Sequence, residues 1–261
     1  MITVLMSVYN GEDYLVTAIE SILLQSYQNF SFIIVNDAST DSSLDIIKNF
    51  QRSSDKIILI NNKKNIGLTK SLNIALKEVQ SKYVARQDCD DISDIHRFEK
   101  QLNFMETHPE IKLLGTRYNE IDETGRIMGP QSLRFIKESK DIRKNILRFN
   151  PFAHGSVMIR TDILKEMNGY NELFLFAQDY ELWLRILNDH NACNLDDELM
   201  SRRVTQNIIS IKNLDKQRAY VVKAKLKYLR RIRLTDCFFL LKDIARIAEF
   251  RVSKKLWRRH D

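Results

Sequence analysis

Cysteine, glycine and proline are all scarce in this sequence, which has three, seven and three of them in 261 residues. Cys89, Cys193 and Cys237 are far apart and form no Cys-x-x-Cys pair, so neither a zinc site nor a disulfide framework is expected. The low glycine and proline content, with 44% hydrophobic and 29% charged residues, is typical of a globular protein. The few, widely separated cysteines fit a protein of the reducing cytoplasm.

Long apolar runs and glycine-rich phosphate loops are also missing. No window reaches the roughly 18 apolar residues of a membrane-spanning helix, and the opening MITVLMSVYN lacks the basic start of a secretory signal, so we expect neither. GxGxxG and GxxxxGKS/T do not occur, which argues against a dinucleotide-binding fold and a P-loop. Bound phosphates would then have to be neutralised by a metal ion held on carboxylates.

Positive charge is concentrated near the end of the sequence. Residues 212–261 hold 16 Lys or Arg against five Asp or Glu, a balance of +11, whereas residues 1–211 hold 25 against 29. Such a run is often only a solvated helix face. Here Phe238, Phe239 and Trp257 are interleaved with the cations. Because each cation near an anionic leaflet contributes about 1 kcal/mol, we expect peripheral attachment to the inner face of the cytoplasmic membrane.

Strand and helix patterns alternate over the first hundred residues. Short apolar runs at 2–8, 30–35, 57–60 and 83–86 predict strands. Between them, apolar residues recur at helical spacing, as in Leu68, Leu72, Ala75 and Val79. This alternation predicts an α/β fold with a mostly parallel sheet covered by helices on both faces.

Polar residues follow three of these predicted strands. They are Tyr9-Asn10-Gly11, Asn36-Asp37-Ala38-Ser39 and Asp88-Cys89-Asp90-Asp91. Ligands of parallel α/β sheets bind beyond the carboxyl ends of the strands, so we predict a site there. Taken alone, the aspartates would more often be the solvated start of the following helix, and Asp91 in particular is predicted to cap it.

Seven motifs together resemble one large enzyme family. The chain is similar to the inverting family 2 glycosyltransferases of the GT-A fold, of the non-processive bacterial kind that builds surface polysaccharides. The QxxRW motif of processive synthases is absent. The matching segments are MSVYNGEDYLVTAIESILLQSY (6–27), IIVNDASTD (33–41), NIGLTKSLNIAL (65–76), YVARQDCDDIS (83–93), HRFEKQ (96–101), NPFAHGSVMIR (150–160) and FAQDYELWLRI (176–186).

The resemblance covers about residues 2–210 and implies a domain division. It implies a GT-A domain at 1–211, with a Rossmann-like, mostly parallel sheet flanked by helices. Residues 1–106 would form the half that binds the nucleotide-sugar and residues 107–211 the half that binds the acceptor. Residues 212–261 would follow as a basic helical extension.

The resemblance also implies roles for residues that bind the donor, a UDP-sugar. Tyr9 matches the aromatic residue that stacks on uracil, and Asp37 matches the carboxylate that accepts a hydrogen bond from the base. Asp88-Cys89-Asp90 matches the DxD element, in which Asp90 coordinates Mn²⁺ or Mg²⁺ and Asp88 lies near the ribose and the metal. Such a cation suits carboxylate and phosphate oxygens and stabilises the departing diphosphate.

Two cations and one further carboxylate complete the set that the resemblance implies. Lys70 and Arg86 stand at motif positions from which they could reach the diphosphate. Asp179 matches the general base that takes the proton of the acceptor hydroxyl, which gives in-line displacement with inversion.

Contacts to the acceptor are predicted for His154, Gln178 and Trp183. His154 could equally be a satisfied structural histidine, and Trp183 could be core packing. Gln178 replaces a glutamate that many relatives carry. Thr205 stands where many relatives have a histidine near the metal, so no ligand is assigned to that loop.

The predicted function is transfer of a hexose or N-acetylhexosamine from a UDP-sugar to a hydroxyl of a lipid-linked or oligosaccharide acceptor, in the synthesis of a bacterial O-antigen, capsule or exopolysaccharide. A nucleotidyltransferase acting on sugar phosphates is an alternative, but GEDYL after the first strand lacks its glycine-rich basic loop. A nucleic-acid-binding protein with a basic tail is another. The acidic body and the lack of a reading motif argue against a nucleic-acid partner.

Overall fold

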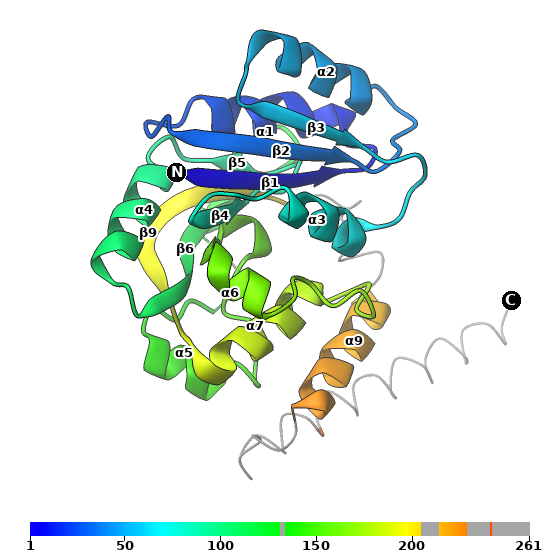
Figure 1. Cartoon of the computed structure of the whole chain (residues 1–261). Coiled ribbons are helices and arrows are strands. Elements are labelled where there is room, and N and C mark those ends of the chain that lie inside the picture. Colours follow the sequence, from blue (N-terminus) through cyan, green and yellow to red (C-terminus); the bar gives the residue numbers. More distant parts are fainter. Residues whose placement is uncertain (131–133, 205–213, 229–240, 242–261) are drawn as a thin grey trace, which may run out of the picture.

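The described strands form one mixed β-sheet, with helices on both faces (Figure 1). The computed structural model describes residues 1–130, 134–204, 214–228 and 241. In this part of the chain the strand order is β3–β2–β1–β4–β8–β6–β9–β5, and β7 pairs with β6. The strands are β1 (Ile2–Val8), β2 (Phe30–Asn36), β3 (Ile57–Asn61), β4 (Tyr83–Arg86), β5 (Ile92–Ser93), β6 (Ile111–Ile121), β7 (Ile127–Pro130), β8 (Met158–Arg160) and β9 (Asn191–Arg203).

Two apolar layers fix the helices to the sheet. In β1 the side chains of Val4 and Met6 face one layer, with α1, α2 and α4, while Leu5 faces the other, with α3, α6 and α7. Side chains of a strand alternate between the faces, so a strand buried on both sides is apolar throughout. The helices are α1 (Glu12–Leu23), α2 (Ser43–Ser53), α3 (Leu68–Lys77), α4 (Arg97–Thr107), α5 (Ser139–Asn145), the 3₁₀ turn η1 (His154–Ser156), α6 (Thr161–Glu166), α7 (Gln178–Asp189) and α9 (Leu214–Lys227).

The first half of the sheet confirms the predicted alternation of strands and helices. β1 pairs in parallel with β2 and with β4, and β2 pairs in parallel with β3. The crossovers between these strands contain α1, α2 and α3. The carboxyl ends of β1, β2 and β4 therefore lie together at one edge, where the predicted site falls.

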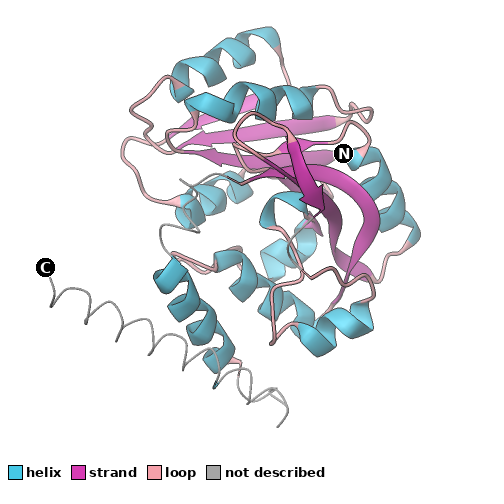
Figure 2. Ribbon diagram, turned by 180° about the vertical axis from the view of Figure 1, so that it is seen from behind, coloured by secondary structure: helices cyan, strands magenta, loops and turns pink. Residues whose placement is uncertain are grey.

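The second half of the sheet contains strands that the sequence patterns did not reveal. β8 is antiparallel to both β4 and β6, so the sheet is mixed from this point. β6 and β9 are long, pair in parallel and shift register at several places, including between Thr116 and Arg117. Figure 2 shows the resulting long, curved strands from behind. The curvature brings the end of β9 to β5, just after the aspartates at 88–91.

The described part of the basic extension packs back onto the rest of the protein. α9 lies against α7, and its Val222 and Ala224 are buried. Cys237 and the aromatics Phe238, Phe239 and Trp257, on which the predicted membrane contact depends, lie outside the described residues. Among the helices that the structure does describe, none combines the length and the apolar character needed to cross a membrane.

Candidate active site

The ends of three neighbouring strands gather the predicted donor-binding residues. β1 lies between β2 and β4 and runs parallel to both. The N–H of Asp37 donates to the carbonyl of Val8 (2.8 Å), which ties the turn after β2 to the end of β1. Tyr9, Asp37 and Asp88 therefore follow adjacent strands at the same sheet edge.

Asp37 and Tyr9 differ sharply in exposure. The Asp37 carboxylate is 2% exposed and accepts hydrogen bonds from Asn62 Nδ2 (2.8 Å), Ile66 N (3.0 Å) and Gly67 N (2.8 Å). It therefore holds the loop between β3 and α3 against the strand ends. Tyr9 is 49% exposed, as a ring that stacks on a ligand must be. Their contacts with a base stay predictions.

The two cations predicted to reach the diphosphate lie in different surroundings. Lys70 is exposed in the first turn of α3. Arg86 is 1% exposed and donates to the carbonyls of Leu5 (2.8 Å) and Gln87 and to the carboxylate of Asp88. Burial works to raise the pKa of Asp88, but the charges around it, with Arg86 foremost, hold that pKa below its ordinary value. In this structure Arg86 orients Asp88.

Carboxylates are crowded at Asp88, Asp90 and Asp91. Burial and then the negative charge of Asp88 raise the pKa of Asp90 to about 6. Burial, followed by the charges of Asp90 and Asp88, also raises the pKa of Asp91 well above its ordinary value. Negative charge gathered in this way favours a cation beside it.

The prediction that Asp91 caps the following helix is wrong. That helix, α4, begins at Arg97, and His96 precedes it. Asp91 is 4% exposed, and its carboxylate accepts a hydrogen bond from the N–H of Arg203 (2.9 Å) at the end of β9. The residue therefore joins the turn after β4 to a strand more than a hundred residues later.

The donor set at these aspartates fits a hard divalent cation. Asp88 and Asp90 supply carboxylate oxygens, which Mg²⁺ and Mn²⁺ prefer. Gly155 leaves room there, since a Cβ at this position would lie 3.1 Å from Asp88 Oδ2 and 3.0 Å from Asp91 Oδ2. Among the described residues no three His, Cys, Asp or Glu side chains form a closed metal site. An open pair of carboxylates suits Mg²⁺, which commonly binds one or two carboxylates together with substrate phosphates.

Two arginines beside the aspartates were not among the predicted site residues. Arg202 and Arg203 end β9, and both lower the pKa of Asp90, though less than burial raises it. Arg203 also donates from Nε to the carbonyl of Asp90 (3.0 Å) and lies over the ring of Tyr14, 4.3 Å from its centroid. The adjacent pair of arginines in the sequence was the signal that could have marked them. Thr205, beyond them, lies outside the described residues.

His154 lies beside Arg86, Tyr170 and Trp183. Its Nε2 accepts a hydrogen bond from Arg86 Nε (3.3 Å) and lies 2.8 Å from the hydroxyl of Tyr170. Burial and the neighbouring charge of Arg86 lower the pKa of His154 to about 3, so the ring is neutral at ordinary pH. These contacts favour the structural role that the sequence left open, and a contact with the acceptor stays a prediction.

The other two residues predicted to contact the acceptor are buried. Trp183 is 0% exposed and packs edge-on against Phe152, with ring centroids 6.0 Å apart. Its side chain lies in the core, which is the alternative that the sequence had left open. Gln178, the first residue of α7, is 9% exposed. Neither side chain is presented to a ligand in this structure.

Asp179, the predicted base, stands in the first turn of α7. Ala177, in the left-handed conformation (φ 54°), turns the chain into the helix. Asn150 Nδ2 donates to Asp179 Oδ2 (3.0 Å) and orients the carboxylate. Burial and, to a smaller extent, the charge of Asp88 raise the pKa of Asp179, which places the two carboxylates in one electrostatic site. Asp179 also lines a pocket of about 220 Å³.

The sequence matches a defined enzyme family over most of its length. Residues 3–167 match the profile described as Glycosyl transferase family 2. EpsE of Bacillus subtilis, named as a glycosyltransferase, is 38% identical over 206 residues, which cover 77% of this chain and 72% of EpsE. The amylovoran biosynthesis glycosyltransferase AmsE of Erwinia amylovora is 32% identical over 265 residues, which cover 98% of each chain.

Solved structures share the fold at low sequence identity. S. aureus TarS (residues 1–349), in complex with UDP-GlcNAc, matches with a TM-score of 0.73 and 18% identity, over 93% of this chain and 71% of that one. The mannosyltransferase PcManGT of Pyrobaculum calidifontis, in complex with GDP-Man and Mn²⁺, matches with a TM-score of 0.69 and 14% identity, over 98% and 79%. With the family match and the site geometry, these similarities establish that the chain belongs to glycosyl transferase family 2 and is a glycosyltransferase of the GT-A fold.

Proposed function

We propose that the protein is an inverting, metal-dependent transferase of surface-polysaccharide synthesis. It moves a hexose or N-acetylhexosamine from a UDP-sugar to a hydroxyl of a lipid-linked or oligosaccharide acceptor. One observation carries the proposal. Hydrogen bonds link Asp88 through Arg86 and His154 to Tyr170, and burial first, and also the charges of both Asp179 and Asp88, raise the pKa of Tyr170.

The donor side of the proposal rests on the strand ends. Tyr9 is exposed for stacking, Asp37 fixes the loop beside it, and Asp88 and Asp90 present the oxygens that would hold Mn²⁺ or Mg²⁺. When bound, such a cation neutralises charge on the departing diphosphate. The TarS and PcManGT structures contain UDP-GlcNAc and GDP-Man with Mn²⁺, respectively, which supports a nucleotide-sugar donor here.

Asp179 supplies the base of the reaction. The oxygen of the acceptor hydroxyl attacks the anomeric carbon and forms the new glycosidic bond, while the bond from that carbon to the diphosphate oxygen breaks. The bond electrons leave with the nucleoside diphosphate, and the hydroxyl proton passes to Asp179. Burial raises the pKa of Asp179 above that of an ordinary carboxyl, which makes it a better proton acceptor. Attack opposite the leaving group inverts the anomeric centre.

The surrounding residues keep these groups in place. Arg86, which is only 1% exposed, holds Asp88 through an ion pair. His154, neutral and bonded to Tyr170, fills the space between Arg86 and Trp183 without adding charge. Asn150 fixes the direction of the Asp179 carboxylate. Positioning of this kind supplies much of the effect of an enzyme site.

Charge and one named relative support the proposed acceptor and location. The name of AmsE places that relative in the synthesis of the polysaccharide amylovoran, and we extend this class of pathway to the present chain. Residues 212–261, with 16 cations, would hold the enzyme at an anionic membrane surface in the cytoplasm, where lipid-linked acceptors lie. No nucleic acid is needed as a partner.

Release of UDP tests the donor and the metal together. A panel of UDP- and GDP-sugars is incubated with the protein and a lipid-linked sugar acceptor, and nucleotide release is measured with Mn²⁺, with Mg²⁺ and with EDTA. We expect release from a UDP-sugar that EDTA abolishes and that Asp90→Ala reduces at least a hundredfold. Asp197→Ala, an exposed aspartate of β9 that is paired with Lys100, is the matched control. Full activity in EDTA or in Asp90→Ala would remove the metal from the proposal.

A further inference from the structure

The pocket beside Asp179 has two walls, one of which comes from the basic extension. One wall comes from residues 148–150 and from the start of α7, including Ala177 and Tyr180. The other comes from α9, through Gln217, Arg218, Val221 and Lys225. α9 of the basic extension therefore lines the same pocket as Asp179, the candidate base.

The lining of this pocket is positively charged apart from the base. Among the described residues that line it, the charged groups besides Asp179 are Arg148, Arg218 and Lys225. Lys225 is 2% exposed, with its Nζ 6.0 Å from the centroid of the Tyr180 ring. Three cations around a small space favour an anion within it.

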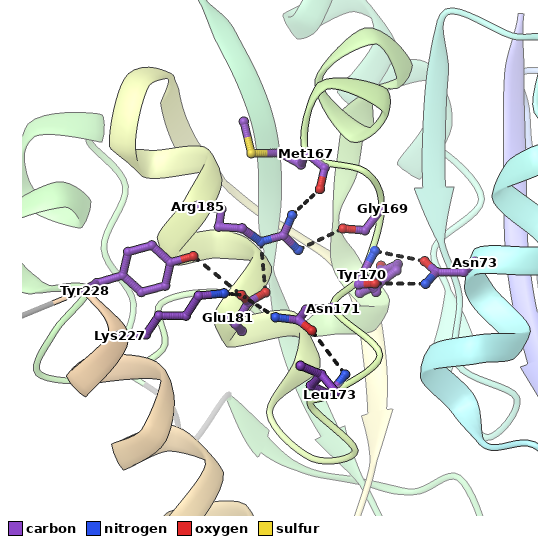
Figure 3. A network of polar contacts seen from close by, with 10 residues as sticks. All are labelled: Asn73, Met167, Gly169, Tyr170, Asn171, Leu173, Glu181, Arg185, Lys227 and Tyr228. Carbon is purple, nitrogen blue, oxygen red and sulfur yellow. Dashed lines mark hydrogen bonds and ion pairs between the residues drawn. The ribbon is translucent and has the colours of Figure 1, made fainter.

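A network of polar contacts around a buried carboxylate links the end of α9 to α7 (Figure 3). Glu181 of α7 is 0% exposed, and its carboxylate accepts hydrogen bonds from Lys227 Nζ (3.2 Å) and Tyr228 Oη (3.4 Å) at the end of α9. The same carboxylate accepts from Arg185 Nε (2.9 Å) and Asn171 Nδ2 (3.1 Å). Glu181 is two residues after Asp179 in α7, so its contacts with Lys227 and Tyr228 keep α9 close to the candidate base.

We propose that this pocket is a subsite for a phosphate or diphosphate group carried by the sugar acceptor, with Arg218 and Lys225 of α9 as its recognition residues. The inference rests on the function proposed above and specifies its acceptor. A volume of about 220 Å³ suits one charged group next to the reacting sugar. Three cations match the charge of a phosphate better than that of a neutral hydroxyl-rich sugar. Such a group places the acceptor hydroxyl beside Asp179 and distinguishes phosphorylated acceptors from neutral ones.

Phosphate binding tests the subsite without knowledge of the acceptor sugar. UDP and Mg²⁺ are added to saturation so that the donor site is filled, and inorganic phosphate is then titrated by ³¹P NMR. We expect phosphate to bind the wild-type chain and to bind Arg218→Gln about tenfold more weakly, as for the loss of one charge-assisted hydrogen bond. Arg218→Lys keeps the charge and should retain most of the affinity.

Lys223→Gln is the matched control, because Lys223 is exposed on the same helix and lies over Phe174 and Tyr220, outside the pocket lining. It should bind phosphate as the wild type does. Equal phosphate affinity in wild type and Arg218→Gln, or no phosphate binding with UDP present, would overturn the subsite. UDP affinity is measured in the same samples, so a failure to bind UDP would count against the proposed function instead.

Three forms of each acceptor sugar then identify which kind of phosphate the pocket recognises. Transfer to each sugar is compared as a diphosphate linked to a short lipid, as a 1-phosphate and as a methyl glycoside. We expect Arg218→Gln to raise KM about tenfold for one of the phosphorylated forms while the donor KM stays unchanged. An equal effect on the neutral glycoside would refute phosphate recognition.

Discussion

Glu181 offers a sharp test of the polar network that joins α7 to α9 and to the loop at 167–174. Its carboxylate is 0% exposed and pairs with Arg185, whose side chain is 16% exposed. Lys227, Tyr228 and Asn171 donate to the same carboxylate. Glu181→Gln keeps the volume and removes the charge, so that the change isolates the ionic part of this network.

The expected loss in the free energy of unfolding follows from these exposures. Breaking a buried ion pair by removing one partner costs 3–5 kcal/mol, and Arg185 keeps the carbonyls of Met167 and Gly169 as acceptors, which favours the lower value of about 3 kcal/mol. Lys227 is 49% exposed, so its pair adds little. For a domain of this size a loss of about 3 kcal/mol lowers Tm by roughly 6–12 °C.

Denaturant unfolding and hydrogen exchange measure the two parts of this prediction. The free energy of unfolding should fall by about 3 kcal/mol in Glu181→Gln, and amides of α9 and of residues 167–174 should exchange faster. Asp197→Asn is the control, because it removes an exposed pair with Lys100 and should cost less than about 1 kcal/mol. A Glu181→Gln protein as stable as that control, with unchanged exchange in α9, would refute the reasoning.

Three further predictions follow from the site and the extension. The pKa of His154 is about 3 in the folded chain, below its unfolded value, so its contribution to stability is present above pH 6.5 and is lost as pH falls toward 3. Between pH 6 and pH 4 the free energy of unfolding in urea should fall by about 2 kcal/mol more in the wild type than in His154→Gln. Equal losses in the two proteins would contradict this. Gly155→Ala should lower kcat at least tenfold in a folded protein, because the new Cβ would press on the carboxylates of Asp88 and Asp91; an unchanged kcat would show that their placement is not critical. The whole chain should float with anionic vesicles at low salt and detach at 0.5 M salt, whereas equal flotation with neutral vesicles, or a salt-sensitive gel shift with RNA, would count against the membrane proposal.

Local patterns were sufficient to predict the first half of the fold. The apolar runs at 2–8, 30–35, 57–60 and 83–86 became β1, β2, β3 and β4 with ends shifted by at most one residue. β1, β2 and β4 are parallel and largely buried, which makes them apolar on both faces, so that their signal is strong in the sequence. For the same reason the polar residues after β1, β2 and β4 could be placed at one edge in advance.

The second half depends on contacts that no short window contains. β9 carries a polar stretch, Asp196-Asp197-Glu198, and its register against β6 is interrupted, so neither strand shows a clean alternation. Asp91 resembled a helix cap because its partner, the N–H of Arg203, is 112 residues away in sequence. The pocket beside Asp179 could not be predicted either, since one wall is provided by α9.

The most direct test of the account is transfer by Asp179→Asn. This variant keeps the shape of the side chain and its partner Asn150 but cannot take a proton from the acceptor. Glycosyl transfer and UDP affinity are measured with the donor and acceptor on which the wild type acts. The account predicts that transfer falls at least a thousandfold while UDP affinity stays within about threefold of the wild type. Transfer at a rate close to that of the wild type would show that Asp179 is not the base.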